Sequence, residues 1–230
     1  MCGRYVLASS LPQLAAFFDA AYDASTETAY RPSWNVPPSR LVLALTTGEG
    51  GRVISRYRWG LVPSWAKEES FGARTFNARA ESVATKPTFR AAFKSRRAIV
   101  PADAFYEWSK IPGEGRQPYA FARADGSPLA FAGLWETWRD PARSEEEDAP
   151  VRSCTIVTTE AGEDLGGIHD RQPVVLEREA VDRWLDPELR DRDELEAMLR
   201  PSPTGTLLRH RVGRAIGKVG IDGPALLEAI

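Results

Sequence analysis

The sequence predicts a single α+β domain built around a strongly curved, barrel-like antiparallel sheet with peripheral helices. Short strand-like runs recur along the chain between turn signals, and helical periodicity is confined to a few segments. A length of 230 residues suits one large domain or two small ones, and 43% hydrophobic residues are enough for a substantial core. We expect widely separated segments to meet at one face of the sheet.

The first part of the chain alternates strand and helix signals. Arg4 to Leu7 indicates a short strand, and a capped helix is expected to begin at Ser10-Leu11-Pro12 and to continue through Phe18. Two β-rich runs, Leu41 to Thr46 and Arg52 to Trp59, flank a glycine-rich turn. This spacing predicts a β-hairpin and not a phosphate-binding loop.

Strands dominate the middle of the chain. Helical spacing covers Thr88 to Arg97, and the strand-like runs Ala98 to Val100 and Phe105 to Trp108 follow it. Tyr119 to Arg123 and Leu129 to Trp138 are expected to form a further antiparallel pair across a short turn.

The last part of the chain adds strands and two helices. Cys154 to Thr159 is a β-branched run, in which Cys154 is expected to be a core thiol, and Thr206 to Val212 alternates like a strand, with His210 in a structural role. Helices are predicted over Glu177 to Leu185 and Pro187 to Leu199. We expect them to pack outside the sheet through Val181, Trp184, Leu185, Leu195 and Leu199.

The composition argues against several classes of protein. No apolar run approaches the roughly 20 residues that cross a bilayer, and the start lacks the pattern of a signal peptide, so we expect a cytoplasmic protein with no membrane partner. The cysteines Cys2 and Cys154 and the histidines His169 and His210 have neither the spacing of a disulfide framework nor that of a zinc site. We therefore expect no metal and no cofactor.

A net charge of −2 conceals a strongly basic segment between residues 52 and 97. It holds eleven lysines and arginines against three acids, so the remainder of the chain carries a charge of −10. A solvated surface is the usual meaning of such clustering, yet arginines beside aromatic rings also suit phosphate contacts with base stacking. The acidic stretch Asp140 to Pro150, by contrast, predicts a mobile surface loop without evident chemistry.

Cys2 becomes the N-terminus if the initiator methionine is removed. The α-amine and thiol of an N-terminal cysteine lie on adjacent carbons. An aldehyde captured by the amine as an imine can therefore be attacked by the sulfur of the same residue, which closes a thiazolidine ring. Both groups ionise near neutrality, at an unperturbed pKa of about 7.7 to 8.0 and about 8.5. Cys2 is thus a candidate nucleophile, although many proteins carry this residue by chance.

Five short stretches combine polar and aromatic residues in a fixed order: Met1 to Arg4, Trp59 to Trp65, Asn77 to Ser82, Phe105 to Trp108 and Ile168 to Pro173. On these motifs the chain resembles the SOS-response-associated peptidase (SRAP) family, whose members form covalent crosslinks to abasic sites in single-stranded DNA. The resemblance runs from Cys2 to about Leu176. It implies one domain over residues 1–230, in which the tail 213–230 has no assigned role.

The resemblance implies four catalytic residues. Cys2 is the nucleophile, with Asn77 and Glu107 beside it and His169 completing the site. An abasic deoxyribose is mostly a closed hemiacetal, so a proton must move before the aldehyde forms, and His169 titrates in the right range. Apolar surroundings are expected to raise the pKa of Glu107, which could then shuttle protons to and from the imine. Asn77 would orient the Cys2 amine or a sugar oxygen without titrating.

Each of these residues also has a plain structural interpretation. A glutamate between two aromatic residues on a strand is usually exposed, while its neighbours are buried. His169 could simply bond Asp170 within a loop, and Asn77 alone would be a turn or cap residue in most proteins.

The resemblance also implies a DNA-binding surface. Arg4 and Arg79 would grip phosphates on either side of the lesion, and Arg171 would supply a further anion contact. Stacking against bases is expected from Pro38, Trp65 and Trp108, although core packing is the competing account for both tryptophans. Binding to abasic single-stranded DNA should be independent of sequence, weakened by salt and made by a monomer, which would be nucleoid-associated when bound.

Two departures from the family pattern, Ala104 and Gln172, remove no catalytic group.

Two other functions remain open beside covalent capture. One is a thiol peptidase or N-terminal-nucleophile hydrolase with Cys2 as nucleophile and His169 as base. The other is a non-catalytic module that binds single-stranded DNA, for which Cys2 would be dispensable. Strand cleavage by a lyase reaction and self-processing at Met1 are further possible activities.

Overall fold

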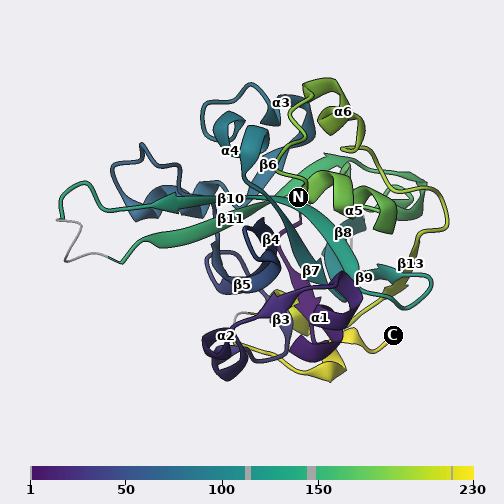
Figure 1. Cartoon of the computed structure of the whole chain (residues 1–230). Coiled ribbons are helices and arrows are strands. Elements are labelled where there is room, and N and C mark those ends of the chain that lie inside the picture. The colour runs from purple at the N-terminus through teal and green to yellow at the C-terminus, as the bar shows by residue number, and fades with distance from the viewer. Residues whose placement is uncertain (1, 112–114, 144–148, 219) are drawn as a thin grey trace.

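The structure is a computed structural model that describes residues 2–111, 115–143, 149–218 and 220–230. Its strands form two sheets. The larger sheet closes on itself as a barrel, and the smaller sheet packs against the barrel (Figure 1). This arrangement confirms the predicted α+β class.

Five strands make the barrel wall. They pair in the order β11 (Val151–Glu160), β10 (Leu129–Trp138), β7 (Arg97–Ala102), β4 (Leu41–Gly48) and β5 (Gly51–Trp59). The wall closes because β11 also pairs with β5, through Ser153 with Arg58 and Cys154 with Trp59. The predicted hairpin is β4 with β5, and β10 and β11 extend together to one side of the molecule (Figure 1).

The expectation of an entirely antiparallel sheet is wrong. Three further strands extend the wall: β12 (Arg171–Pro173), β6 (Asn77–Arg79) and β2 (Ala21–Tyr22). The pairings β11 with β5, β11 with β6 and β2 with β5 are all parallel. Such pairs join strands that are distant in sequence, so no turn signal announces them.

The second sheet is antiparallel and holds the N-terminus. Its order is β13 (Leu207–Arg211), β9 (Gly115–Arg123), β8 (Ala104–Ile111), β1 (Tyr5–Leu7) and β3 (Ser33–Val36). The predicted pair between residues 119–123 and 129–138 is therefore wrong. Both edges of β9 are taken by β8 and β13, whereas β10 pairs with β7 and β11 in the barrel.

Helices lie outside the sheets. The predicted first helix is α1 (Leu11–Phe18), which begins with a capping box between Ser10 and Gln13. The others are α2 (Ala24–Ala29), α3 (Ala80–Val83), α4 (Arg90–Ser95), α5 (Arg178–Leu185) and α6 (Arg192–Ala197), with 3₁₀ turns η1 (Glu69–Arg74), η2 (Glu163–Leu165), η3 (Arg214–Gly217) and η4 (Pro224–Leu227).

Two helices are shorter than predicted. The helix expected over residues 88–97 ends before Arg97, because Arg97 already belongs to β7. The helix expected over residues 187–199 begins only after Asp191, whose side chain caps it by accepting from the Glu194 N–H. The apolar residues expected to face the sheet are all buried: Val181, Trp184, Leu185, Leu195 and Leu199.

The core lies between the barrel and the second sheet. Tyr5 of β1 packs edge-on against Trp59 of β5 at 5.1 Å and against Phe131 of β10 at 6.2 Å between ring centroids. Cys154 is buried in the same core, as expected. Aromatic pairs of this kind stabilise packing beyond their buried area, so they fix how the second sheet sits on the barrel.

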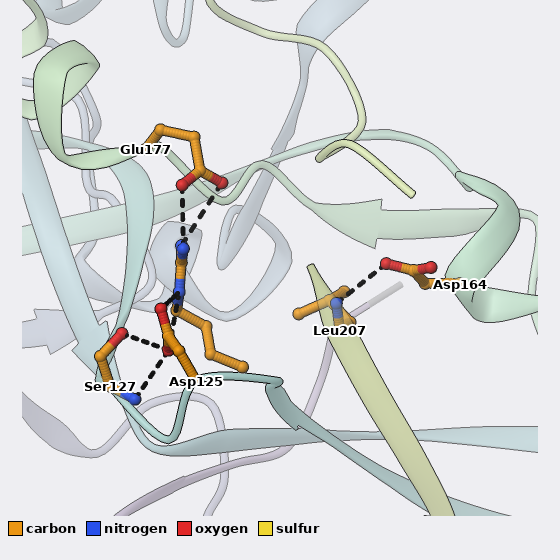
Figure 2. A network of polar contacts seen from close by, with 6 residues as sticks. Asp125, Ser127, Asp164, Glu177 and Leu207 are labelled. Atoms are coloured by element: carbon orange, nitrogen blue, oxygen red, sulfur yellow. Dashed lines mark hydrogen bonds and ion pairs between the residues drawn. The ribbon is translucent and has the colours of Figure 1, made fainter. Parts of the chain in front are cut away.

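Polar contacts reinforce this junction at its rim (Figure 2). The Arg123 guanidinium at the end of β9 donates to Glu177, just before α5, at 2.9 Å. Asp164 of η2 accepts from the Leu207 N–H at 2.9 Å and so joins η2 to β13.

Of the acidic stretch 140–150, residues 144–148 lie outside the described residues. Among the described residues, each helix is too short or too polar to span a bilayer.

Candidate active site

Cys2 lies three residues before the start of β1 at Tyr5 and is fully buried, with 0% of its surface exposed. The Cys2 side chain belongs to the main hydrophobic core, where the barrel and the second sheet meet. Met1 itself lies outside the described residues. The Cys2 carbonyl accepts a hydrogen bond of 2.8 Å from Asn77 Nδ2, which ties the start of the chain to β6.

The environment of Cys2 keeps its thiol protonated. Burial, and then the nearby charge of Glu107, raise the pKa of the Cys2 thiol far above its ordinary range. A thiol in this state is a poor first nucleophile, because the thiolate is the reactive form.

Glu107 lies on β8 and is buried, with 2% of its surface exposed. Side chains alternate along a strand, so Phe105 and Glu107 point toward the barrel while Tyr106 and Trp108 point the other way. The plain interpretation of Glu107 as an exposed residue is excluded because both faces of β8 are covered. Burial, with a smaller effect from the charge of Asp170, raises the pKa of Glu107 to about 7. A carboxyl with this pKa exchanges protons near neutral pH.

His169 lies in the loop between η2 and β12. Its Nε2 is 3.8 Å from Glu107 Oε2. Its Nδ1 accepts from the Arg171 N–H at 2.9 Å. Asp170 Oδ1 also lies 2.9 Å from Nδ1, an approach that becomes an ion pair only when the imidazole is protonated. With Nδ1 as acceptor, the proton of the neutral ring is assigned to Nε2, on the side of Glu107. Burial lowers the pKa of His169, which favours this neutral form.

Asn77 opens β6 and faces the first residues of the chain. Its Nδ2 holds the Cys2 carbonyl, and its Oδ1 is buried without a hydrogen-bond partner among the residues that the structure describes. A buried acceptor in this condition is costly unless another group completes it. Asn77 can therefore accept one more hydrogen bond beside Cys2.

The tertiary structure thus brings together the four residues that sequence reasoning selected. They come from the chain start, β6, β8 and the loop before β12, and they combine a neutral thiol, an amide, a buried carboxyl and a neutral imidazole. This set can orient a small electrophile at Cys2 and move protons to and from it. Within the described residues, no group of three His, Cys, Asp or Glu side chains is placed to hold a metal ion.

The arginines expected to bind DNA lie in three different environments. Arg79 is exposed at the start of α3, two residues after Asn77. Arg4 is half-buried, and its Nη1 donates to Asn35 Oδ1 at 2.5 Å. Arg171 is held in a two-point ion pair with Glu81, at 2.5 and 3.0 Å, and also donates to the Thr158 carbonyl. The exposed guanidinium of Arg79 is therefore open to an anion, whereas the guanidinium of Arg171 is already paired with the carboxylate of Glu81.

The residues expected to stack on bases also differ in exposure. Trp65 is 56% exposed, and its ring meets Phe71 edge-on at 5.3 Å, so core packing does not account for it. Pro38 and Trp108 are half-buried. Trp108 packs partly against the cluster formed by Val212, Ile216 and Leu226.

Sequence reasoning missed two residues that support this site. Glu81 lies in one of the selected motifs, but nothing local shows that it pairs with Arg171. Asn35 lies in a segment between prolines and has no sequence signal, yet it contacts Arg4. Gln172, one of the departures from the family pattern, is buried and accepts from the Gly162 N–H at 2.7 Å, which helps to fix the loop that carries His169.

The fold and the site define a class of protein, a mixed β-barrel domain with a cysteine at its second residue beside a buried carboxyl and an imidazole. Residues 1–219 match the family model described as SOS response associated peptidase (SRAP). The chain belongs to this family, which confirms the resemblance seen in its motifs.

Relatives extend along the whole chain. Abasic site processing protein YoqW of Bacillus subtilis is 36% identical over 229 residues, with 100% of both chains covered. Abasic site processing protein YedK of Escherichia coli is 31% identical over 235 residues, again with 100% of both covered. Abasic site processing protein HMCES of Gallus gallus is 33% identical over 235 residues, which cover 89% of this chain and 68% of that protein.

Solved structures share the fold. A protein from Bacteroides thetaiotaomicron superposes with a TM-score of 0.88 over 100% of both chains at 22% identity, a level at which the likeness shows the fold alone. A protein from Bordetella bronchiseptica superposes with a TM-score of 0.75 at 27% identity, with 92% of this chain and 100% of that chain covered.

Proposed function

We propose that this protein processes abasic sites in single-stranded DNA and captures them covalently through Cys2 after Met1 is removed. The observation that carries the proposal is the contact between His169 and Glu107 beside a cysteine that can become N-terminal. Membership of the SRAP family and relatives named as abasic site processing proteins support it.

The first step is opening of the sugar ring. Glu107 has a pKa of about 7, so its carboxylate form can take the proton of the C1′ hydroxyl. The carboxyl then returns that proton to the ring oxygen, which gives the aldehyde and a free 4′ hydroxyl. His169 lies 3.8 Å away and turns its Nε2–H toward this carboxyl.

The second step is imine formation by the Cys2 amine. The nitrogen adds to the aldehyde carbon, and the resulting hydroxyl leaves as water after it receives a proton from the neutral carboxyl of Glu107. The third step adds the Cys2 sulfur to the imine carbon, and its proton passes to the nitrogen. No atom is lost in this closure. The raised pKa of the buried thiol favours this order, with the amine first and the sulfur second.

The same thiol argues against the thiol peptidase alternative. A peptidase of that kind needs a thiolate as its first nucleophile, and burial opposes ionisation of Cys2. Beta-elimination of the imine, which would cut the strand, competes with ring closure. A sulfur held next to the imine carbon favours closure because it is intramolecular.

DNA would be held by exposed groups around the site. Arg79 can contact a phosphate, and Trp65 offers a ring to a base. Neither contact reads base identity, so binding should be independent of sequence and sensitive to salt. The protein is proposed to act as a monomer.

Intact mass analysis tests the proposal. Protein is mixed with a single-stranded oligonucleotide that carries one abasic site, and with an undamaged oligonucleotide as control. We expect loss of Met1 and an adduct equal to protein plus DNA minus one water. Imine and thiazolidine have the same mass, so borohydride is added in a parallel sample, which should trap the imine but leave the closed ring unchanged.

Matched variants assign the adduct to one residue. Cys2→Ala should form no stable adduct, and Cys2→Ser should yield at most a reducible imine. Cys154→Ala removes the other buried free thiol and should leave the adduct unchanged. A stable adduct in the Cys2→Ala variant, or in a chain that keeps Met1, would overturn the mechanism.

A further inference from the structure

The C-terminal segment from residue 213 onward has no part in the chemistry proposed above, yet it is tied to an arginine two residues from Cys2. We propose that this segment, acting through Asn35, positions the guanidinium of Arg4 to receive a phosphate of the bound strand. The inference rests on the proposed function in one respect, that single-stranded DNA is the ligand.

Asn35 lies on β3, beside β1, and is 5% exposed. Its Oδ1 accepts from Arg4 Nη1 at 2.5 Å. Its Nδ2 donates to the Ile221 carbonyl at 2.7 Å, with longer contacts to the carbonyls of Lys218 and Ile216. The carbonyl oxygen of the Asn35 amide therefore binds Arg4, while its NH₂ group binds the C-terminal segment.

Arg4 touches the same segment directly. Its Nη1 donates to the Ile216 carbonyl at 3.1 Å in addition to Asn35. Within the described chain, both hydrogen bonds of this side chain fall on Nη1, which leaves Nε and Nη2 for an anion. Because the guanidinium is planar, holding one nitrogen at two acceptors restricts the direction of the others.

The C-terminal segment does not depend on Asn35 for its own position. It lies beside β3 (Figure 1), where Asp222 accepts from Ser33 Oγ at 2.7 Å and from the Trp34 N–H at 2.6 Å. Its apolar residues Ile216 and Leu226 are buried with Val6 and Tyr106. Asn35 and the Ile216 carbonyl together therefore hold Arg4 Nη1 against an anchored segment.

This connection has a physical benefit for binding. A free arginine loses much rotamer entropy when it grips a phosphate, whereas a side chain already held in one orientation loses less. Fixed donors beside Cys2 would also set the register of the backbone relative to the lesion. The role is one of positioning, since Asn35 acts through Arg4 and does not itself meet the DNA.

A double-mutant cycle on the full chain tests the coupling. Affinity for an undamaged single-stranded oligonucleotide is measured at several salt concentrations for wild type, Arg4→Ala, Asn35→Ala and the double variant. We expect Arg4→Ala to weaken binding by about tenfold and to reduce the salt slope by about 0.7. Asn35→Ala should reproduce most of that loss, and the double variant should bind no more weakly than Arg4→Ala alone.

A matched control separates positioning from stability. Gln117 is another buried amide, and it donates to the Val212 carbonyl directly before this segment, without contact to Arg4. Gln117→Ala should lower the melting temperature but keep the affinity within about twofold of wild type.

The outcomes distinguish this inference from the proposed function. Wild type that does not bind single-stranded DNA would overturn both. If Arg4→Ala weakens binding but Asn35→Ala does not, or if the two losses add, the positioning role is wrong and the proposed function stands. Should Asn35→Ala fail to fold, Asn35→Ser replaces it, because the shorter side chain withdraws the amide from Arg4 without adding a charge. It should weaken binding and reduce the salt slope as Arg4→Ala does, and an unchanged affinity and slope would count against the inference.

Discussion

The Nε2 atom of His169 lies 3.8 Å from Oε2 of Glu107, although the two residues come from a loop and from the interior of a different sheet. Burial lowers the pKa of the imidazole and raises the pKa of the carboxyl to about 7. The site therefore holds a neutral imidazole facing a carboxyl that can exchange a proton near neutral pH.

Glu107→Gln should slow adduct formation strongly. The amide keeps the shape of the side chain but cannot release or take up a proton, and general acid–base groups contribute about 10²- to 10⁴-fold to rate. The measurement is the single-turnover rate at saturating abasic DNA. Affinity for undamaged DNA should remain at the wild-type level, and a variant that crosslinks at the wild-type rate would exclude Glu107 from the chemistry.

The same carboxyl should make stability depend on pH. Its pKa rises from an ordinary 4.5 to about 7 on folding, so folding favours the protonated form. The stability contributed by Glu107 is then fully present below pH 4.5 and is lost as the pH rises through about 7. Urea unfolding of wild type and Glu107→Gln at low and high pH should show wild type losing on the order of 3 kcal/mol relative to the variant. A constant difference would mean that Glu107 is not desolvated.

Asn77→Ala should uncouple Cys2 from β6. The variant loses the hydrogen bond to the Cys2 carbonyl and the buried acceptor beside it, so we expect crosslinking to slow by about tenfold to a hundredfold through poorer positioning. Thr158→Val is the matched control, because it removes a hydrogen bond to the Ala78 carbonyl of the same strand without touching Cys2. Equal slowing in both variants would indicate a general effect on β6.

Trp65→Ala should weaken binding of single-stranded DNA without affecting the fold. A ring that is 56% exposed contributes little to the core, whereas stacking on a base contributes about 1 to 3 kcal/mol. Fluorescence anisotropy with a labelled oligonucleotide measures the affinity, and thermal unfolding measures the stability. Trp65→Phe keeps a ring and should retain most of the affinity. If alanine binds as tightly as wild type, Trp65 lies outside the DNA path.

Local features of the sequence predicted many of the elements. The capping pattern at Ser10 located α1, the glycine-rich turn located the hairpin of β4 and β5, and helical spacing identified the buried side of α5. These features depend on near neighbours, so a single sequence carries them. The same reasoning predicted helices that are too long at residues 88–97 and 187–199. Helical periodicity alone does not show that Arg97 pairs in β7 or that Asp191 caps the start of α6.

The sequence by itself determined which residues could do chemistry: a cysteine able to become N-terminal, and an asparagine, a glutamate and a histidine within recognisable motifs. Only the tertiary structure decided that β9 and β10 separate into different sheets, that Cys2 is buried, and that Asn35 links Arg4 to the C-terminal segment. The physical reason is one of range. Side-chain chemistry and periodicity are properties of short stretches, whereas strand pairing, burial and the resulting pKa shifts depend on segments that meet only when the barrel closes.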